Sequence, residues 1–514
     1  MKARARLFVP RLRLLLALSG GTAAVLAGAT ETAGLTLKAA LESALRQSPG
    51  LRVQAEVIEQ KEGVREQATG AFDWNLSSGV TVAKDRTPVP GLPGFEPVDS
   101  STETTYSVGV GRVFRNGISI QPSVGASVVD THSAAAPTTG AAQLSFQIDV
   151  PLLRGLGTDS TGAAEAAARG DVRVARLLYQ HALAAQAHRT AMAYWSSRAA
   201  DEILLLQQDV EKAAERLVES TKVLVETRIF PPAFQMQAEA NLRDKRTVRI
   251  EAELGAKSAR IALGQALGLE PEAIAGTPGA ADGFPALAAA ERLLSESRRP
   301  ELLRRALGAR ADLGATRESL VPLNLLARQA ERDLRPRLDL TLRAGYKGLS
   351  SGNDLLAPLN ERLTGANGQV GVTVAWPMRN TYQRGVLRER RADVRAAEAQ
   401  AAELAQVIAG EVLVALEQVR LRADAVRSAQ DTVEISRKAL AAQYEQLRSG
   451  DGTILDVISL ENLSVGARIR YVNAHAAYAI AVAQLRYALG AVFEPAAGTE
   501  NSLVLTDVSQ LPTF

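Results

Sequence analysis

Strict alternation of apolar and polar residues marks several short segments of this 514-residue chain. The clearest example covers positions 143–150, where the two kinds of residue take opposite faces: Leu144, Phe146, Ile148 and Val150 against Gln143, Ser145, Gln147 and Asp149. A period of two is the pattern of a β-strand whose faces meet different environments. We expect such strands at about 73–84, 143–153, 336–347 and 368–377. A soluble sheet and a membrane β-barrel, with apolar residues toward lipid, both fit this alternation.

A further pair of alternating segments surrounds the dipeptide Asn116-Gly117. Asn-Gly between two such runs is a strong signal for a tight β-hairpin, because both residues readily adopt positive φ. We therefore expect an additional hairpin at about 104–129, which has no counterpart in the second half of the chain.

Very long helical patterns follow the strands. Residues 171–230 contain neither glycine nor proline, and residues 381–449 contain only Gly385 and Gly410. At 1.5 Å per residue, a helix of 60 residues is roughly 90 Å long, which ordinary globular domains seldom contain. Apolar residues recur every seven positions at Val426, Val433, Leu440 and Leu447. This spacing predicts helices that pack along their length in the manner of a coiled coil.

The chain contains two copies of the same order of predicted elements. Residues 30–270 and 299–494 each pass from a helix through strands to a long helical hairpin, and a linker at 271–298 joins them. In each copy a proline ends the strands, Pro151 or Pro377, and the distance from it to the closing glycine is similar, 117 and 113 residues. Residues 495–514 form a short tail. A repeat at this scale predicts two structurally similar halves.

The second helical hairpin turns at 449–453, where Gly450, Asp451 and Gly452 interrupt the helical pattern. Glycine allows the tight or left-handed backbone that a chain reversal requires. Thr453 and Asp456 stand three residues apart, which is the spacing of a capping box at the start of a helix. This turn alone is a sufficient structural explanation for the break.

The N-terminal residues 1–29 resemble a secretory signal peptide, with a basic start, an apolar stretch and an Ala-x-Ala site. A membrane anchor is the alternative reading. The segment carries five positive charges, so its removal would change the net charge from +3 to −2. The basic isoelectric point therefore belongs largely to this segment, and the rest of the chain gives no support for a nucleic-acid partner.

Candidate catalytic chemistry is absent from the sequence. The chain has no cysteine and four histidines, of which His181 and His188 stand seven residues apart without carboxylates at metal-ligand spacing. It has no nucleophile elbow, phosphate-binding loop or dinucleotide fingerprint. We expect no enzyme activity, no cofactor and no metal site.

Several short segments of the sequence, in this order and spacing, resemble those of the TolC-type outer-membrane efflux proteins. They are LTLKAALESALRQSPGL, PLLRG, RPELL, PMRN, GTILDVISLENL and RYVNAHAAYAIAVAQLRYALG. The resemblance implies an α+β fold: a TolC-like trimeric outer-membrane β-barrel continued by a long periplasmic α-helical barrel, with two internal structural repeats per subunit. Each subunit would give four strands to a shared 12-stranded barrel, and the linker and tail would form an equatorial belt. On this basis the extra hairpin either extends at the rim or outside the membrane, which we expect, or adds strands to the barrel.

The resemblance also implies a function. The chain would be a homotrimeric channel in the outer membrane that exports small molecules passively, together with a periplasmic adaptor and an inner-membrane pump. The exit duct of a type I protein-secretion system is an alternative with the same fold. An exported coiled-coil scaffold without a pore is an alternative of another class, although it leaves the paired sets of amphipathic strands unexplained.

The same resemblance points to three groups of functional residues. The periplasmic entrance would include Gly450, Asp451, Gly452, Thr453, Asp456 and Ser459, with Asp456 at the first acidic position of the family motif and serine at the second. At the other helix tip the chain departs from the Val-Gly that the family often has, and apolar residues exposed there would contact an adaptor. The candidates are Arg228, Ile229, Phe230, Pro231 and Pro232, and the alternative is that the apolar ones pack within the turn. The strand-to-helix junctions would be Pro151, Arg154, Pro377 and Arg379.

Overall fold

The computed structural model describes residues 34–88, 98–131, 138–228, 231–287, 296–352, 354–355, 357–359, 364–449, 452–495 and 503–512. The expected signal peptide at 1–29 lies outside these residues. The same holds for four candidate site residues: Ile229, Phe230, Gly450 and Asp451. The chain divides into two compact units, which we call the strand unit (Val57–Ala175 and Thr316–Ala401) and the helix unit (Met1–Glu56, Arg176–Ala315 and Ala402–Phe514).

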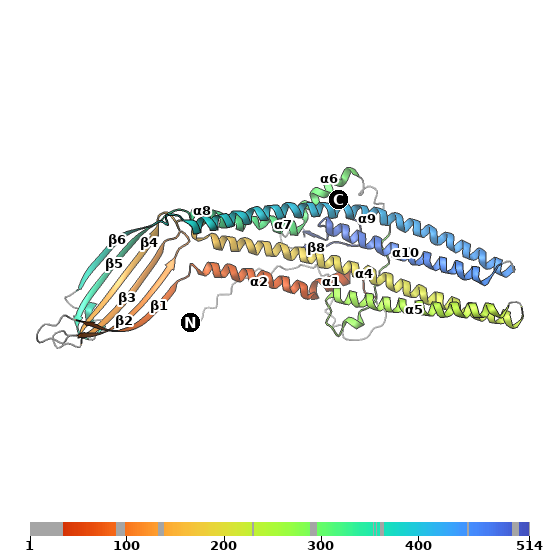
Figure 1. The fold of residues 1–514 in the computed structure, drawn as a ribbon, viewed down its shortest axis with the longest axis horizontal. Coiled ribbons are helices and arrows are strands. Elements are labelled where there is room, and N and C mark those ends of the chain that lie inside the picture. Colours follow the sequence, from red (N-terminus) through yellow and green to blue (C-terminus); the bar gives the residue numbers. More distant parts are fainter. Residues whose placement is uncertain are drawn as a thin grey trace, which may run out of the picture. The chain divides into compact units, whose positions relative to one another are not determined.

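Each half of the chain passes through helices, strands, one very long helix and a second helix (Figure 1). The first half contains α1 (Leu37–Gln47), α2 (Pro49–Gly70), β1 (Asn75–Pro88), β2 (Val98–Val113), β3 (Ser119–Thr131), β4 (Thr139–Pro151), α3 (Thr158–Thr161), α4 (Ala163–Glu226) and α5 (Pro232–Leu267). The second half contains α6 (Arg299–Ala309), α7 (Ala311–Glu318), α8 (Leu320–Arg332), β5 (Arg337–Ser351), η3 (Ala357–Leu359), β6 (Thr364–Ala375), α9 (Thr381–Ser449) and α10 (Ile454–Ala488). The connection carries η1 (Ile274–Gly276) and η2 (Glu296–Arg298), and the tail carries β7 (Phe493–Pro495) and β8 (Leu503–Leu505).

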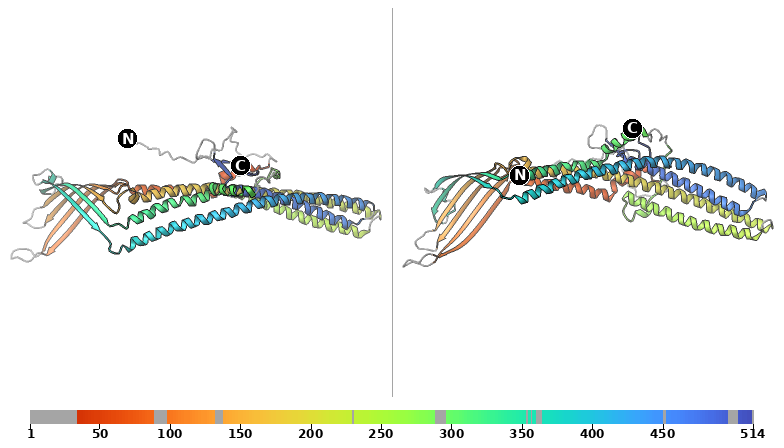
Figure 2. Two further views of the ribbon diagram at one scale, coloured as in Figure 1. Left: turned by 90° about the horizontal axis from the view of Figure 1, so that it is seen from above. Right: turned by 45° about the horizontal axis from the view of Figure 1, so that its top comes forward.

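The strand unit contains one sheet of six antiparallel strands in the order β1-β2-β3-β4-β5-β6. Figure 2 shows these strands side by side, each next to its neighbours in the sequence. The four strands expected from alternation are confirmed as β1, β4, β5 and β6, with bounds that differ by a few residues. Within the described strands, β1 and β6 have a partner on one side only, so they form the two edges of the sheet.

The extra hairpin is part of the sheet, and the expectation of a rim or outside extension is wrong. Its strands β2 and β3 lie between β1 and β4, and β2 pairs with β1 from Asn75 to Pro88 without a gap. The physical reason is that β2 and β3 match their neighbours in length and alternate in the same way, so they complete the hydrogen-bond ladder on both sides. The sheet therefore has six described strands, in place of the four per subunit that the resemblance implies.

The ladder has one local irregularity at Pro122 in β3. Proline has no N–H to donate, and the paired residues of β2 and β3 pass directly from Gly109–Ser123 to Arg112–Ile120. Proline is normally confined to the edges of sheets, yet here it lies inside a six-stranded sheet. The pairing resumes in the same register beyond the proline, so the hairpin keeps its alignment.

The helix unit has a core made mainly of alanine, leucine and valine, with two large aromatic side chains at its centre. Tyr194 and Trp195 of α4 are 0% and 1% exposed. The Tyr194 hydroxyl donates to the Leu35 carbonyl at 2.9 Å and accepts from the Asp282 N–H at 3.0 Å. Leu35 also forms a parallel bridge with Ala280. These contacts fix the connection between the two halves against the start of α1.

The seven-residue spacing of apolar residues in α9 extends further toward the N-terminus than expected. Val412, Val419 and Val426 repeat every seven positions and are all fully buried, whereas Val433 and Leu447 are half-buried. Valine, alanine and other short side chains allow neighbouring helices to approach closely along such a seam. The predicted packing seam is confirmed, and its most buried part lies in the middle of α9.

Candidate functional site

One face of the sheet carries apolar residues and the opposite face carries polar or small residues, and this division continues through all six strands. The register places these apolar residues on one face: Leu76, Val80, Tyr106, Val108, Ile120, Val124, Leu144, Phe146, Leu340, Leu342, Val370 and Val372. The opposite face carries Ser77, Thr81, Ser107, Gly109, Ser123, Gly125, Gln143, Ser145, Thr341, Arg343, Gln369 and Thr373. We call these the apolar face and the polar face.

Hydrogen bonds connect neighbouring strands across the polar face. The Asp149 carboxylate of β4 accepts from Ser119 of β3 at 3.2 Å and from Thr341 of β5 at 2.8 Å. It also accepts from Gln147 at 2.9 Å, and the Gln147 amide oxygen accepts from Arg343 at 2.6 Å. These side chains satisfy one another in a surface suited to contact with water.

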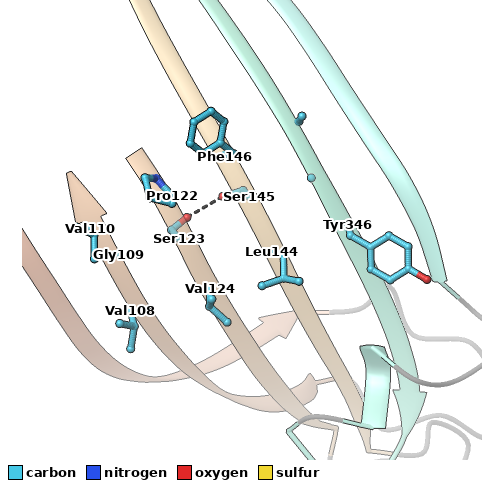
Figure 3. A pocket seen from close by; sticks show the side chains of 12 residues that line it. Val108, Gly109, Val110, Pro122, Ser123, Val124, Leu144, Ser145, Phe146 and Tyr346 are labelled. Carbon is cyan, nitrogen blue, oxygen red and sulfur yellow. Dashed lines mark hydrogen bonds between the residues drawn. The ribbon is translucent and has the colours of Figure 1, made fainter. Parts of the chain in front are cut away.

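The apolar face is exposed in the single chain. Leu76, Val370 and Trp376 are 70%, 73% and 71% exposed, which is unusual for large apolar side chains gathered on one surface. A shallow hollow of about 510 Å³ lies over β2 to β5, between Val108, Leu144 and Phe146 (Figure 3). Its walls are largely apolar, so hydrocarbon suits it better than a polar ligand. The Ser123–Ser145 hydrogen bond in Figure 3 joins β3 to β4.

The turn of the inserted hairpin is anchored to the first turn of α4. Arg115 donates two hydrogen bonds to the Glu165 carboxylate, at 2.6 and 3.0 Å. Arg169 donates to the same carboxylate at 2.5 Å, and the Arg115 guanidinium lies 4.8 Å from the centre of the Phe72 ring. The Glu165 side chain is only 5% exposed. The hydrogen bond from Arg115, followed by that from Arg169, lowers the pKa of Glu165 to about 2 despite its burial.

The backbone of this turn touches the loop that follows β4. Gly117 has a φ of +94°, and an added Cβ would lie 2.1 Å from the Gly155 carbonyl oxygen and 2.9 Å from the Pro151 ring. The Gly157 N–H donates to the Asn116 carbonyl at 3.0 Å, and the Thr161 hydroxyl donates to the Arg115 carbonyl. Only glycine fits at position 117, because both the backbone angle and the close approach exclude a side chain.

The predicted strand-to-helix residues lie where the strands meet the helices, but they differ in their contacts. Pro151 ends β4, and Arg154 lies 3.5 Å from Asp333. Pro377 and Arg379 are exposed between β6 and α9, and the stronger contact there belongs to the next residue. Asn380 has a φ of +45° and its side-chain amide donates to the Leu334 carbonyl at 3.0 Å. No pattern in the sequence indicated this role of Asn380.

The capping box expected at the start of α10 is confirmed. The Asp456 N–H donates to the Thr453 hydroxyl at 3.3 Å, and the Thr453 N–H donates to the Asp456 carboxylate at 3.2 Å. Gly452 does not adopt the left-handed backbone, but an added Cβ would lie 3.0 to 3.3 Å from the end of α9, so the turn is tight there. Asp456 and Ser459 are both exposed. The entrance role of this turn stays a prediction.

At the other helix tip, α4 ends at Glu226 and α5 begins at Pro232. Arg228, two residues after the end of α4, has a φ of +60°, and Pro231 takes the N-cap position of α5. Arg228, Pro231 and Pro232 are all exposed. Their exposure makes them available to a partner, and the adaptor contact remains a prediction.

A buried charged cluster in the helix unit had no signal in the sequence. The Arg310 side chain, 5% exposed, donates to Asp312 at 2.6 Å and to Glu411 of α9 at 2.7 Å, and it lies over the Tyr487 ring. Burial alone would lower the pKa of Arg310, but the hydrogen bonds and charges of Asp312 and Glu411 outweigh it and raise that pKa. The cluster joins the break between α6 and α7 to both α9 and α10.

Comparison with known proteins agrees with this geometry. Residues 302–491 match the family model described as Outer membrane efflux protein. No curated protein sequence matches the chain.

Solved structures extend the agreement to most of the chain. The outer-membrane channel OprN has a TM-score of 0.66 at 16% identity, over 88% of this chain and 90% of its own. The Campylobacter jejuni CmeC outer membrane channel has a TM-score of 0.66 at 15% identity, over 93% and 92%. The open state of the Neisseria gonorrhoeae MtrE outer membrane channel has a TM-score of 0.61 at 18% identity, over 88% of each chain. The second half of the chain therefore matches the outer membrane efflux protein family, and the chain has the fold of these outer-membrane channels.

Proposed function

We propose that the chain forms, as a homotrimer, the outer-membrane exit duct of a tripartite efflux system and exports small molecules passively. The observation that carries this proposal is the sheet with an apolar face, a polar face and two free edges. In lipid, every backbone N–H and C=O must be paired, so a sheet that spans the membrane cannot keep open edges. Pairing between the β1 edge of one subunit and the β6 edge of the next removes both edges at once.

The exposed apolar surface of α9 supports assembly in the helix unit as well. Leu413, Val414 and Leu421 are 40%, 57% and 56% exposed and border one shallow groove. In the described part of the chain, α9 is the one helix long and apolar enough to cross a membrane by composition, which alone is weak evidence. A neighbouring subunit that covers this surface explains it without a membrane, because the long helices would then form a shared periplasmic tunnel.

The helix tips are the proposed sites of contact and gating. A periplasmic adaptor, itself bound to an inner-membrane pump, would contact the tip at Arg228, Pro231 and Pro232. The α9–α10 turn with Asp456 and Ser459 would surround the tunnel entrance, with one carboxylate per subunit facing the threefold axis. Both assignments rest on the family resemblance together with the exposure of these residues.

A secretion duct for proteins would use the same fold, and no described contact favours it. A coiled-coil scaffold without a pore would have no need of a sheet with one apolar and one polar face. The experiment is to isolate outer membranes, test for a trimer that dissociates on heating, and reconstitute it in planar bilayers. A conducting trimer is expected. A soluble monomer without conductance would overturn the proposal.

A further inference from the structure

We propose that the trimeric barrel of this protein has 18 strands, six from each subunit, and therefore a wider outlet than a barrel of 12. The inference rests on the proposed trimer, because one sheet has two free edges and needs other copies to close. Three copies of a six-stranded sheet give 18 strands. The diameter of a barrel grows roughly in proportion to its strand number, so the outlet would be about 1.5-fold wider.

The strongest evidence is that β2 and β3 are fully built into the sheet. β2 pairs with β1 over 14 consecutive positions, and β3 pairs with β4 over 11. A hairpin that left the barrel would leave β1 free to pair with β4, whereas the two strands share no pairs here. Removal of β2 and β3 from the barrel would break both ladders in every subunit.

The side chains of the inserted strands fit the barrel positions. Tyr106, Val108 and Val124 continue the apolar face from Val80 of β1 to Leu144 of β4. Ser107, Gly109, Ser123 and Gly125 continue the polar face with side chains that are small. A hairpin surrounded by water would gain nothing from an unbroken apolar face, whereas a barrel strand needs that face toward lipid and a polar face toward the lumen.

The turn between β2 and β3 is held at the end of the sheet that meets the helices. Arg115 is bound there to Glu165 of α4, and Gly117 packs against the loop after β4. β1, β4, β5 and β6 continue into helices, whereas β2 and β3 turn back. The insertion therefore widens the sheet without adding a helix to the subunit.

A wider outlet changes the size of the solutes that can pass through the barrel. Barrels of 16 to 18 strands leave an open aqueous channel. The polar face of β2 and β3, which would face the lumen, carries Glu103, Thr105 and Gln121 besides the small residues Ser107, Gly109, Ser123 and Gly125. We infer that the barrel admits solutes from the outer side that a 12-stranded barrel would exclude. Size selection would then fall to the helical tunnel and its entrance.

The test uses single cysteines, since the natural chain contains none. Trimers carrying Ser107→Cys, Ser123→Cys, Val108→Cys or Val124→Cys are reconstituted in bilayers and treated with a charged, membrane-impermeant thiol reagent. The two serine positions should react and lower the single-channel conductance, and the two valine positions should do neither. Gln369→Cys and Val370→Cys, adjacent positions on β6, serve as the lumen and lipid controls.

Equal reactivity of the serine and valine positions, with conductance unchanged at both, would overturn the 18-stranded barrel while leaving the channel intact. A wild-type protein that forms no conducting trimer would instead contradict the proposed function. The two failures are therefore distinguishable.

A second measurement gives the outlet size. Neutral polyethylene glycols of increasing size are added on the outer side, and the largest one that still changes the conductance is recorded.

Deletion of 98–137 leaves residues 89–97 to join β1 to β4, which run in opposite directions and can pair. The radius of the largest admitted polymer should be about 1.5-fold smaller in this variant. An unchanged cutoff would contradict the inference, and the cysteine labelling stands on its own if the deletion variant does not assemble.

Discussion

Arg115 and Glu165 form a two-point ion pair between the turn of the inserted hairpin and the first turn of α4, with nitrogen–oxygen distances of 2.6 and 3.0 Å. The carboxylate is buried and accepts a third hydrogen bond from Arg169. A charged group in this position is stable only because it is paired. The pair therefore fixes the hairpin turn against the helix that follows the sheet.

The pairing of Glu165 predicts a specific pH dependence. Because its pKa in the folded protein is about 2, below the ordinary 4.5, the stabilisation is complete above about pH 4.5 and is lost as the pH falls toward 2. The temperature at which the trimer dissociates should therefore fall over this interval. Glu165→Gln should dissociate at a lower temperature at pH 7 and show a weaker dependence between pH 4.5 and 2. Glu66→Gln, an exposed position on α2, should match the wild type, and identical pH curves for all three proteins would contradict the assignment.

Gly117 should not tolerate a side chain. Gly117→Ala places a Cβ 2.1 Å from a carbonyl oxygen and forces a positive φ on alanine, a backbone strain that alone costs about 1–3 kcal/mol. The variant should assemble poorly and dissociate at a lower temperature on semi-denaturing gels. Gly63→Ala in α2 is the matched control, because its Cβ meets nothing within 4 Å and alanine favours a helix by up to about 1 kcal/mol. Equal losses in the two variants would show that the turn contact is unimportant.

The role of Asp456 at the entrance can be separated from its role in the capping box. Asp456→Asn removes the charge but keeps a side-chain oxygen that can accept the Thr453 N–H, whereas Thr453→Ala removes the cap and keeps the charge. If a ring of carboxylates surrounds the entrance, Asp456→Asn should reduce cation selectivity and block by multivalent cations, and Thr453→Ala should leave both nearly unchanged. Thr453→Ala should instead cost about 1 kcal/mol of helix stability. Unchanged selectivity in Asp456→Asn would reject the ring.

The buried Arg310 cluster should be important for stability. Arg310→Met leaves the Asp312 carboxylate without its closest cationic partner, and removal of one member of a buried pair typically costs about 3–5 kcal/mol. The effect should be near the lower end of that range, because Glu411 is 36% exposed and retains contact with water. Urea unfolding followed by circular dichroism measures the loss. Arg304→Met, at an exposed position of α6, is the control and should unfold near the wild-type midpoint.

The elements that follow a local pattern were predictable from the sequence. The period of two predicted β1, β4, β5 and β6, because each of these strands has apolar residues on one face and polar residues on the other. The three-residue spacing of Thr453 and Asp456 gave the capping box, and the Asn116-Gly117 dipeptide gave the hairpin turn. Each of these depends on residues close together in the chain.

The partners of an element were not predictable in this way. The alternation of Tyr106, Ser107 and Val108 indicates a strand, but it does not show which strands lie beside it. The contact of Arg115 with Glu165 joins residues 50 positions apart, and the contact of Arg310 with Glu411 joins residues 101 positions apart. Such pairs leave no periodic trace in the sequence, so the insertion of the hairpin into the sheet appears only in the structure.

The central claim is that sheets from neighbouring subunits close a barrel by pairing β1 with β6, and cross-linking of the two edges tests it most directly. Thr81→Cys on β1 is combined in turn with a cysteine at each polar-face position of β6: Gly365, Asn367, Gln369, Gly371, Thr373 and Ala375. Disulfides form only when the two Cβ atoms lie about 3.5–4.5 Å apart, so this panel tests every polar-face position of β6 as the partner of Thr81. On mild oxidation, at least one combination should give covalent dimers and trimers on reducing-agent-free gels, with conductance retained. Monomers alone from every combination, in preparations that conduct, would contradict closure between these edges.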